Sequence, residues 1–158
     1  MTKTIKEAIV ADVSNEVLAG VFGTNDYLLN RALAGFDEEG ARRRLGESAN
    51  PVSWIVGHIA YWKQEILTLL GGPDVWPVAD RAGYRGVTRD APASDETPWA
   101  ELVRLVGTLQ QEITPRLAEA SLGDAAQRKS LWELASHEGY HVGQIGIGRR
   151  LLGMEPTL

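Results

Sequence analysis

A chain of 158 residues without a cysteine cannot be cross-linked by disulfides, and it cannot use thiolate metal ligands or a cysteine nucleophile. Hydrophobic residues make up 44% of it and charged residues 23%, which predicts one globular domain over residues 1–158. The formal net charge of −5 argues against nucleic-acid binding, because contacts with phosphates require a cationic surface.

The N-terminal stretch, MTKTIKEAIVADVSNEV, carries acidic residues throughout and lacks the unbroken apolar region of a secretory signal. No segment approaches the roughly 18 consecutive apolar residues that a membrane span requires. We therefore expect a cytoplasmic protein with no membrane partner.

Apolar residues recur at helical spacing in four segments, and no segment shows the strict alternation of a strand, so the expected class is all-α. The first helix is predicted from about Ile5 to Ala34. Its expected apolar stripe consists of Ile9, Val13, Val17, Val21, Leu28 and Leu29. The second helix is predicted to start at Asn50-Pro51, with Asn50 as the cap and proline in the first helical position, and to end at Gly71-Gly72-Pro73.

The third helix is predicted to start with the same chemistry at Thr97-Pro98 and to extend to about Ala120, with Pro115 bending it or ending it early. The fourth is expected to begin with a capping box formed by Ser130 and Glu133 and to stop at Gly153.

The link between the second and third helices, residues 72–96, is too long for a tight turn between antiparallel neighbours. A helix of 20 residues is about 30 Å long, and a link of this size can run along its whole length. The sequence therefore predicts a four-helix bundle with one long crossover, in which the second and third helices are parallel.

The chain has three histidines, His58 in the second predicted helix and His137 and His141 in the fourth. Positions i and i+4 share a helical face, so the last two imidazoles can converge on one ion. All three fall in apolar stripes that should face the interior. His58 by itself would be interpreted as a hydrogen-bonded core residue, but the set favours a metal site with an open position for a ligand.

His137 and His141 also form an H-E-x-x-H pattern, which invites comparison with zinc proteases. We expect a different chemistry, because only 17 residues follow His141 and no strand is predicted to border a peptide cleft. Glu138 lies about 100° around the helix from His137, where it could bond Arg149 or orient a water at the metal.

Two motifs together, NPVSWIVGH (residues 50–58) and SLWELASHEGYHVGQI (residues 130–145), resemble the DinB-like, or YfiT-like, superfamily of metalloenzymes. The resemblance implies a four-helix bundle with an up-down-down-up path, a divalent metal held by His58, His137 and His141, and a homodimer. It also implies enzymes that use low-molecular-weight thiols such as mycothiol, bacillithiol or glutathione as cosubstrates.

Our leading hypothesis is accordingly a metal-dependent enzyme of thiol-transferase type that acts on a small molecule. The expected ion is zinc or nickel, with iron or manganese as alternatives. Tyr61 and Gln144, each one turn from a histidine, are the candidate catalytic residues, with core packing and helix pairing as their alternatives. Two other functions stay open: a hydrolase that uses the same metal site, and a non-catalytic stress-response or dimerisation module.

Overall fold

The computed structural model describes residues 13–44, 46, 49–76, 81–86, 97–120, 122 and 124–157. Within these ranges all regular structure is helical and there is no strand, which confirms the all-α prediction. The α-helices are α2 (Asn15–Leu33), α3 (Glu38–Arg42), α4 (Val52–Leu69), α6 (Trp99–Glu119) and α7 (Ala125–Leu151), and a 3-10 turn, η1, spans Ala82–Tyr84.

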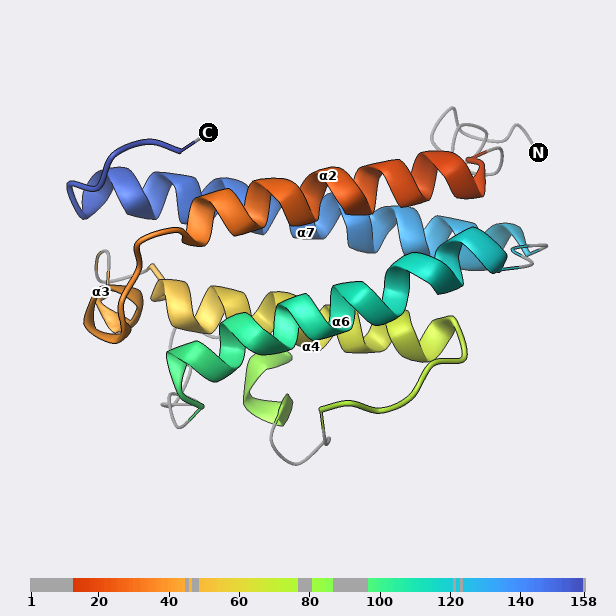
Figure 1. Cartoon of the computed structure of the whole chain (residues 1–158), viewed down its shortest axis with the longest axis horizontal. Coiled ribbons are helices and arrows are strands. Elements are labelled where there is room, and N and C mark those ends of the chain that lie inside the picture. The colour runs from red at the N-terminus through yellow and green to blue at the C-terminus, as the bar shows by residue number, and fades with distance from the viewer. Residues whose placement is uncertain are drawn as a thin grey trace.

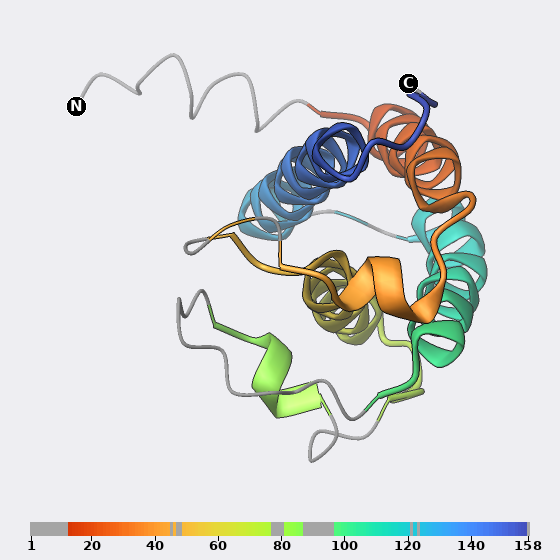
Figure 2. The ribbon, with the colours of Figure 1, turned by 90° about the vertical axis from the view of Figure 1, so that its left-hand side faces the viewer.

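The four long helices lie side by side, with α2 and α7 running in one direction and α4 and α6 in the other (Figure 1). Hydrogen bonds between helix ends show the same directions. The Arg149 guanidinium near the end of α7 donates to the carbonyl of Ala32 near the end of α2 (3.0 Å), whereas Gln127 near the start of α7 donates to Leu69 at the end of α4 (3.1 Å). In the view along the bundle, η1 lies outside α4, on the side away from α2 (Figure 2).

The buried face of α2 differs from the expected stripe. Of the expected stripe, Leu29 is buried, and Val13, Val21 and Leu28 are partly buried against the core. The fully buried side chains also include five that were not expected: Leu18, Phe22, Asn25, Ala32 and Leu33. Val17 is 49% exposed, so the predicted stripe is rotated by about one position along the described part of the helix. Ser14 caps α2 by accepting a hydrogen bond from the amide of Val17 (3.3 Å), and the predicted first turns before residue 13 lie outside the described residues.

The two proline-containing helix starts are shifted by one residue. Pro51 and Pro98 themselves occupy the cap positions, with ψ angles of 155° and 143°, so Asn50 and Thr97 lie outside their helices. The first amide of α6 is instead satisfied from a distance, because Trp99 N–H donates to the carboxylate of Glu38 in α3 (2.9 Å). Pro115 lies inside α6, which continues for four more residues to Glu119.

The fourth helix starts before the predicted capping box. Asp124 is the N-cap of α7 and accepts from the amide of Ala126 (2.9 Å), which puts Ser130 well inside the helix. There the Ser130 hydroxyl donates to the Ala126 carbonyl, and Glu133 forms an ion pair with Lys129 (2.7 Å) instead of capping. The predicted stop is confirmed, since Gly153 has a φ of +73°. Among the described helices, none combines the length and apolar character needed to cross a membrane.

Candidate metal centre

The three histidines meet between α4 and α7. His137 Nε2 lies 3.3 Å from His58 Nε2 and 3.0 Å from His141 Nε2. One ring nitrogen from each residue can be chosen so that all three lie within 4.8 Å of one another. The predicted convergence of imidazoles from two helices is therefore present in the structure.

Hydrogen bonds on the far side of two rings fix which nitrogen is available. His58 Nδ1 donates to the main-chain carbonyl of Tyr84 (2.6 Å), and His141 Nδ1 donates to the side-chain carbonyl of Gln144 (2.7 Å). Both acceptors are oxygens without a proton, so the neutral rings keep their N–H at Nδ1 and present the lone pair at Nε2. Partners of this kind are typical of metal-binding histidines.

The surroundings hold the rings in their neutral, ligating form. Burial lowers the pKa of His58, although the Tyr84 carbonyl opposes the shift. Burial and the neighbouring His58 lower the pKa of His137. Burial is also the main cause that lowers the pKa of His141 to about 4, with Gln144 opposing and the two other histidines adding to the shift. Near neutral pH all three rings are therefore neutral imidazoles.

These features fit a divalent cation. Tetrahedral zinc with Zn–N bonds of about 2.05 Å separates its nitrogen ligands by about 3.3 Å, and the Nε2–Nε2 distances of 3.3 and 3.0 Å are close to that value. Lone pairs that face one another at this distance repel unless a cation or a proton lies between them. In metal-free protein the Nε2–H tautomer of neutral His137 can supply one such proton, and a bound ion would replace it, so the donor set fits a metal ion with three protein ligands.

Close packing of Tyr84 explains the glycine that precedes His58. A β-carbon at Gly57 would overlap the Tyr84 ring, which is 1% exposed. Only glycine allows η1 to approach α4 closely enough for the Tyr84 carbonyl to reach His58. Trp54 stacks on His58 with ring centroids 4.8 Å apart, so the tryptophan forms a wall of the site.

Trp62 adds a donor at the same nitrogen that would bind the ion. Its indole N–H donates to His58 Nε2 (3.2 Å), and its ring lies edge-on to His137 with centroids 5.8 Å apart. Glu65, one turn further along α4, lies 3.6 Å from Arg81 in an ion pair and is not part of the three-histidine cluster.

The glutamate of the H-E-x-x-H pattern does not face the histidines. Glu138 is 4% exposed and forms an ion pair with Lys63 of α4 (Nζ–Oε1 2.8 Å), and Lys63 also donates to Gln110 of α6 (2.5 Å). Burial raises the pKa of the Glu138 carboxyl, and Lys63 limits the rise. The bond to Arg149, one of the two possibilities from the sequence, is absent, because Arg149 instead donates to main-chain carbonyls, among them Ala32 and Glu155. This position removes Glu138 from the role of base at the metal.

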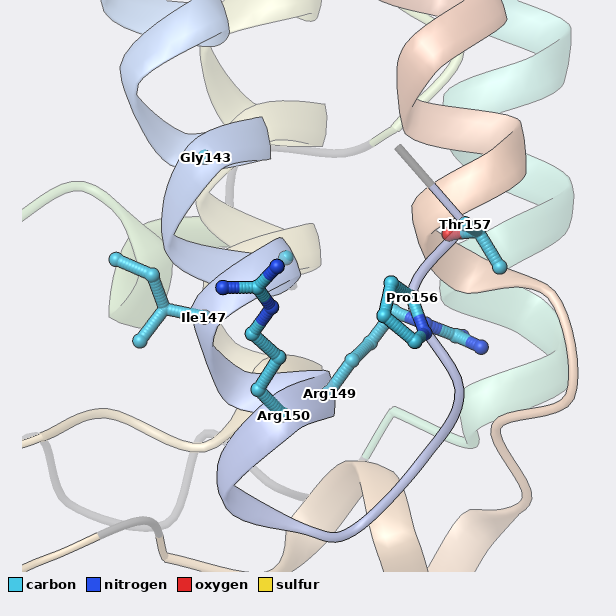
Figure 3. A pocket seen from close by; sticks show the side chains of 7 residues that line it. Gly143, Ile147, Arg149, Arg150, Pro156 and Thr157 are labelled. Carbon is cyan, nitrogen blue, oxygen red and sulfur yellow. The ribbon is translucent and has the colours of Figure 1, made fainter.

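A hollow of ≈ 210 Å³ lies between the last turns of α7 and the C-terminal tail, and Figure 3 shows Arg149 extending toward Pro156 beside it. Arg150 also lines it, nine positions after His141 and so about 180° around the helix. This hollow is therefore separate from the metal centre.

The two predicted catalytic residues are placed differently. Gln144 is part of the centre, since it accepts from His141 and donates to the hydroxyl of Tyr140 (2.9 Å). Tyr61 is 9% exposed and packs edge-on against Trp62, with centroids 5.2 Å apart, so it borders the site through that indole. Their catalytic roles stay predictions.

Sequence reasoning missed Tyr84, Trp62 and Lys63. Tyr84 acts through its carbonyl oxygen, which every residue has, so only its position as a large aromatic in a polar link could have drawn attention to it. Trp62 is one turn after His58, and this spacing was a usable signal. The sequence offers no signal for Lys63, since a lysine is rarely fully buried and is expected at the surface.

Comparison with known families agrees with this site. The sequence model of the DinB superfamily matches residues 24–145, a range that contains all three histidines and both motifs. No curated protein and no solved structure gave a match. Because the family model covers most of the sequence, the chain belongs to the DinB superfamily.

Proposed function

We propose that the protein is an enzyme that holds one divalent metal ion through His58, His137 and His141 and acts on a small molecule. The observation that supports this most strongly is the meeting of three Nε2 atoms from two helices, with two of the rings oriented by Tyr84 and Gln144. Such an ion, when bound, lowers the pKa of a coordinated water or thiol, or polarises a carbonyl.

A low-molecular-weight thiol is our proposed cosubstrate. The chain has no cysteine, so a sulfur nucleophile has to come from solution. The protein's residues contribute by shielding and orientation: Trp54 and Trp62 enclose the rings, and Tyr61 supports Trp62 from behind. Gln144 fixes the tautomer of His141.

Metal analysis of untagged protein tests the site. We expect about one ion of zinc, nickel, iron or manganese per chain, with loss of the ion in His58→Ala and in His137→Ala. Wild-type protein that carries no ion, and whose melting temperature does not respond to added zinc, nickel or manganese, would refute the enzyme proposal.

The type of reaction needs a separate test. Metal-loaded protein is incubated with an electrophile and each of several cellular thiols, and mass spectrometry follows the thioether product. Hydrolysis of esters and amides is measured in parallel without thiol. Thiol-dependent turnover supports the transferase, whereas hydrolysis that ignores thiols refutes it.

We also propose a homodimer, formed through one face of α7. Tyr140, Ile147 and Leu151 are 62%, 62% and 64% exposed, and their spacing puts them on one stripe of the helix. Light scattering should show a dimer for wild type and a monomer for Ile147→Asp. A monomeric wild type would contradict the proposal.

A further inference from the structure

A hollow of ≈ 360 Å³ lies in the seam between α4 and α7, bordered by Trp62, Glu65 and Leu69 of α4 and by Ser130, Glu133 and Leu134 of α7. We call it the α4/α7 groove. Its volume is within the range of small-molecule sites, about 300–1,000 Å³.

Helical spacing connects this groove to the metal centre. Trp62, Glu65 and Leu69 follow His58 by 4, 7 and 11 positions, so they continue its face toward the end of α4. Leu134, Glu133 and Ser130 precede His137 by 3, 4 and 7 positions and continue its face toward the start of α7. Because these two helix ends meet, the groove runs from Trp62, which contacts His58, to Leu69, over about 10 Å.

Trp62 lies where the groove meets the histidines. Its indole N–H donates to His58 Nε2. That nitrogen has a single lone pair, which cannot serve the indole and a metal ion together. In the metal-loaded protein the indole N–H therefore lacks this acceptor, and it is available to a molecule that enters from the groove.

The groove carries carboxylates and no cation among its lining residues. Glu65 and Glu133 stand on opposite walls, and the nearby Arg81 is closer to Asp74 (2.6 Å) than to Glu65 (3.6 Å). Lys129, which pairs with Glu133, is half exposed, and such surface pairs hold weakly. The three carboxylates (Glu65, Asp74 and Glu133) and the two cations (Arg81 and Lys129) together carry a net charge of −1.

We propose that the α4/α7 groove binds the substrate of the metal centre, that it favours a molecule with a cationic group at the end remote from the metal, and that Trp62 donates a hydrogen bond to the end at the metal. The proposal rests on the proposed function, because it assumes that the three histidines hold an ion.

Two thiols of equal chain length test the charge preference, ω-aminohexanethiol and ω-mercaptohexanoate. The protein is loaded with Co²⁺, metal content is measured, and the visible absorption bands of the ion report thiol binding. We expect the amine to bind at least about fivefold more tightly at low ionic strength, with a smaller ratio in high salt. Glu65→Gln/Glu133→Gln changes the net charge of these five groups from −1 to +1, so it should abolish the preference for the amine or reverse it. Glu112→Gln, which breaks a comparable ion pair on α6, should leave it unchanged.

Trp62→Phe tests the donor. It keeps an aromatic ring and removes the N–H, so both thiols should bind about three- to tenfold more weakly, since one hydrogen bond contributes about 0.5–1.5 kcal/mol. Metal affinity should stay equal or rise, because a competitor for His58 is lost. A merely structural tryptophan would instead weaken metal binding.

The failures can be told apart. Wild type that retains no Co²⁺ refutes the proposed function, and this inference with it. Wild type that retains the ion, but binds both thiols equally or keeps its preference in the double glutamine variant, refutes the charged groove only. Unchanged thiol binding in Trp62→Phe refutes the assigned donor.

Discussion

Gly57 determines whether η1 can support the metal centre. In Gly57→Ala the added methyl group overlaps the buried ring of Tyr84, which has to move and take its carbonyl away from His58. We expect a loss of about 1–3 kcal/mol in the free energy of unfolding and a 10–100-fold loss of metal affinity. Denaturant titration and competition with a chelator measure the two quantities.

The matched control for this prediction is Gly107→Ala in α6, where a β-carbon would meet no atom within 4 Å. That change should be neutral or should stabilise the helix by up to about 1 kcal/mol, with unaltered metal affinity. Equal metal affinities in the two variants would contradict the role of Tyr84.

Gln144 is expected to act on metal binding through the orientation of His141. Gln144→Leu removes the acceptor for Nδ1–H and should weaken metal binding 10–100-fold, with little effect on stability because the residue is only partly buried. Gln144→Glu keeps an acceptor oxygen and should restore the affinity. Isothermal titration with Zn²⁺ checks this, and a Leu variant with wild-type affinity would disprove the positioning role.

Three helices are joined by the buried contacts of Lys63 with Glu138 and Gln110. Glu138→Gln leaves the ammonium of Lys63 buried without its counter-ion, which should cost about 3–5 kcal/mol of stability. The double variant Lys63→Met/Glu138→Leu should recover most of that loss, since apolar residues of similar size often replace a buried pair without cost. Urea unfolding of metal-loaded protein provides the values.

This variant also separates two interpretations of the H-E-x-x-H pattern. With Glu138 turned away from the histidines, Glu138→Gln should retain its metal and, below its melting temperature, its turnover. A stable, metal-loaded variant that has lost all turnover would make Glu138 a base after all.

The sequence was informative wherever a structural feature depends on neighbours in the chain. The helical class, the stop at Gly153 and the pairing of His137 with His141 follow from local spacing and backbone chemistry. Features that depend on residues far away in the chain could not be predicted from local spacing. Trp99 is capped by Glu38, sixty-one positions earlier, and His58 is oriented by a carbonyl from a separate 3-10 turn.

The same distinction between local and distant contacts explains why the start of α7 and the buried face of α2 were predicted wrongly. Ser130 and Glu133 have the spacing of a capping box, but Asp124 offers an earlier cap, and Gln127 in the first turn of α7 donates to the Leu69 carbonyl at the end of α4. On α2, Val17 and Leu18 are equally apolar. The helices that pack against α2, namely α6 and α7, decide that Leu18 is buried and that Val17 is 49% exposed.

For the molecule as a whole, the buried histidines predict how stability depends on pH. Burial lowers the pKa of all three below the ordinary value of 6.5, and that of His141 to about 4. Between these values the unfolded chain binds more protons than the folded protein, so the free energy of unfolding falls as the pH falls. We expect the melting temperature of metal-free protein to be nearly constant above pH 7 and to drop by several degrees between about pH 6.5 and 4.5.

Thermal scans across this range, with and without Zn²⁺, test the prediction. Bound metal should raise the melting temperature at neutral pH and lose that effect in acid, because protons compete for the same nitrogens. His141→Gln should show a shallower pH dependence than wild type, since it removes the histidine whose pKa is lowered to about 4. A metal-free wild type whose melting temperature rises on acidification from pH 6.5 would mean that the three rings accept protons more readily in the fold than outside it. They would then be a poor metal site.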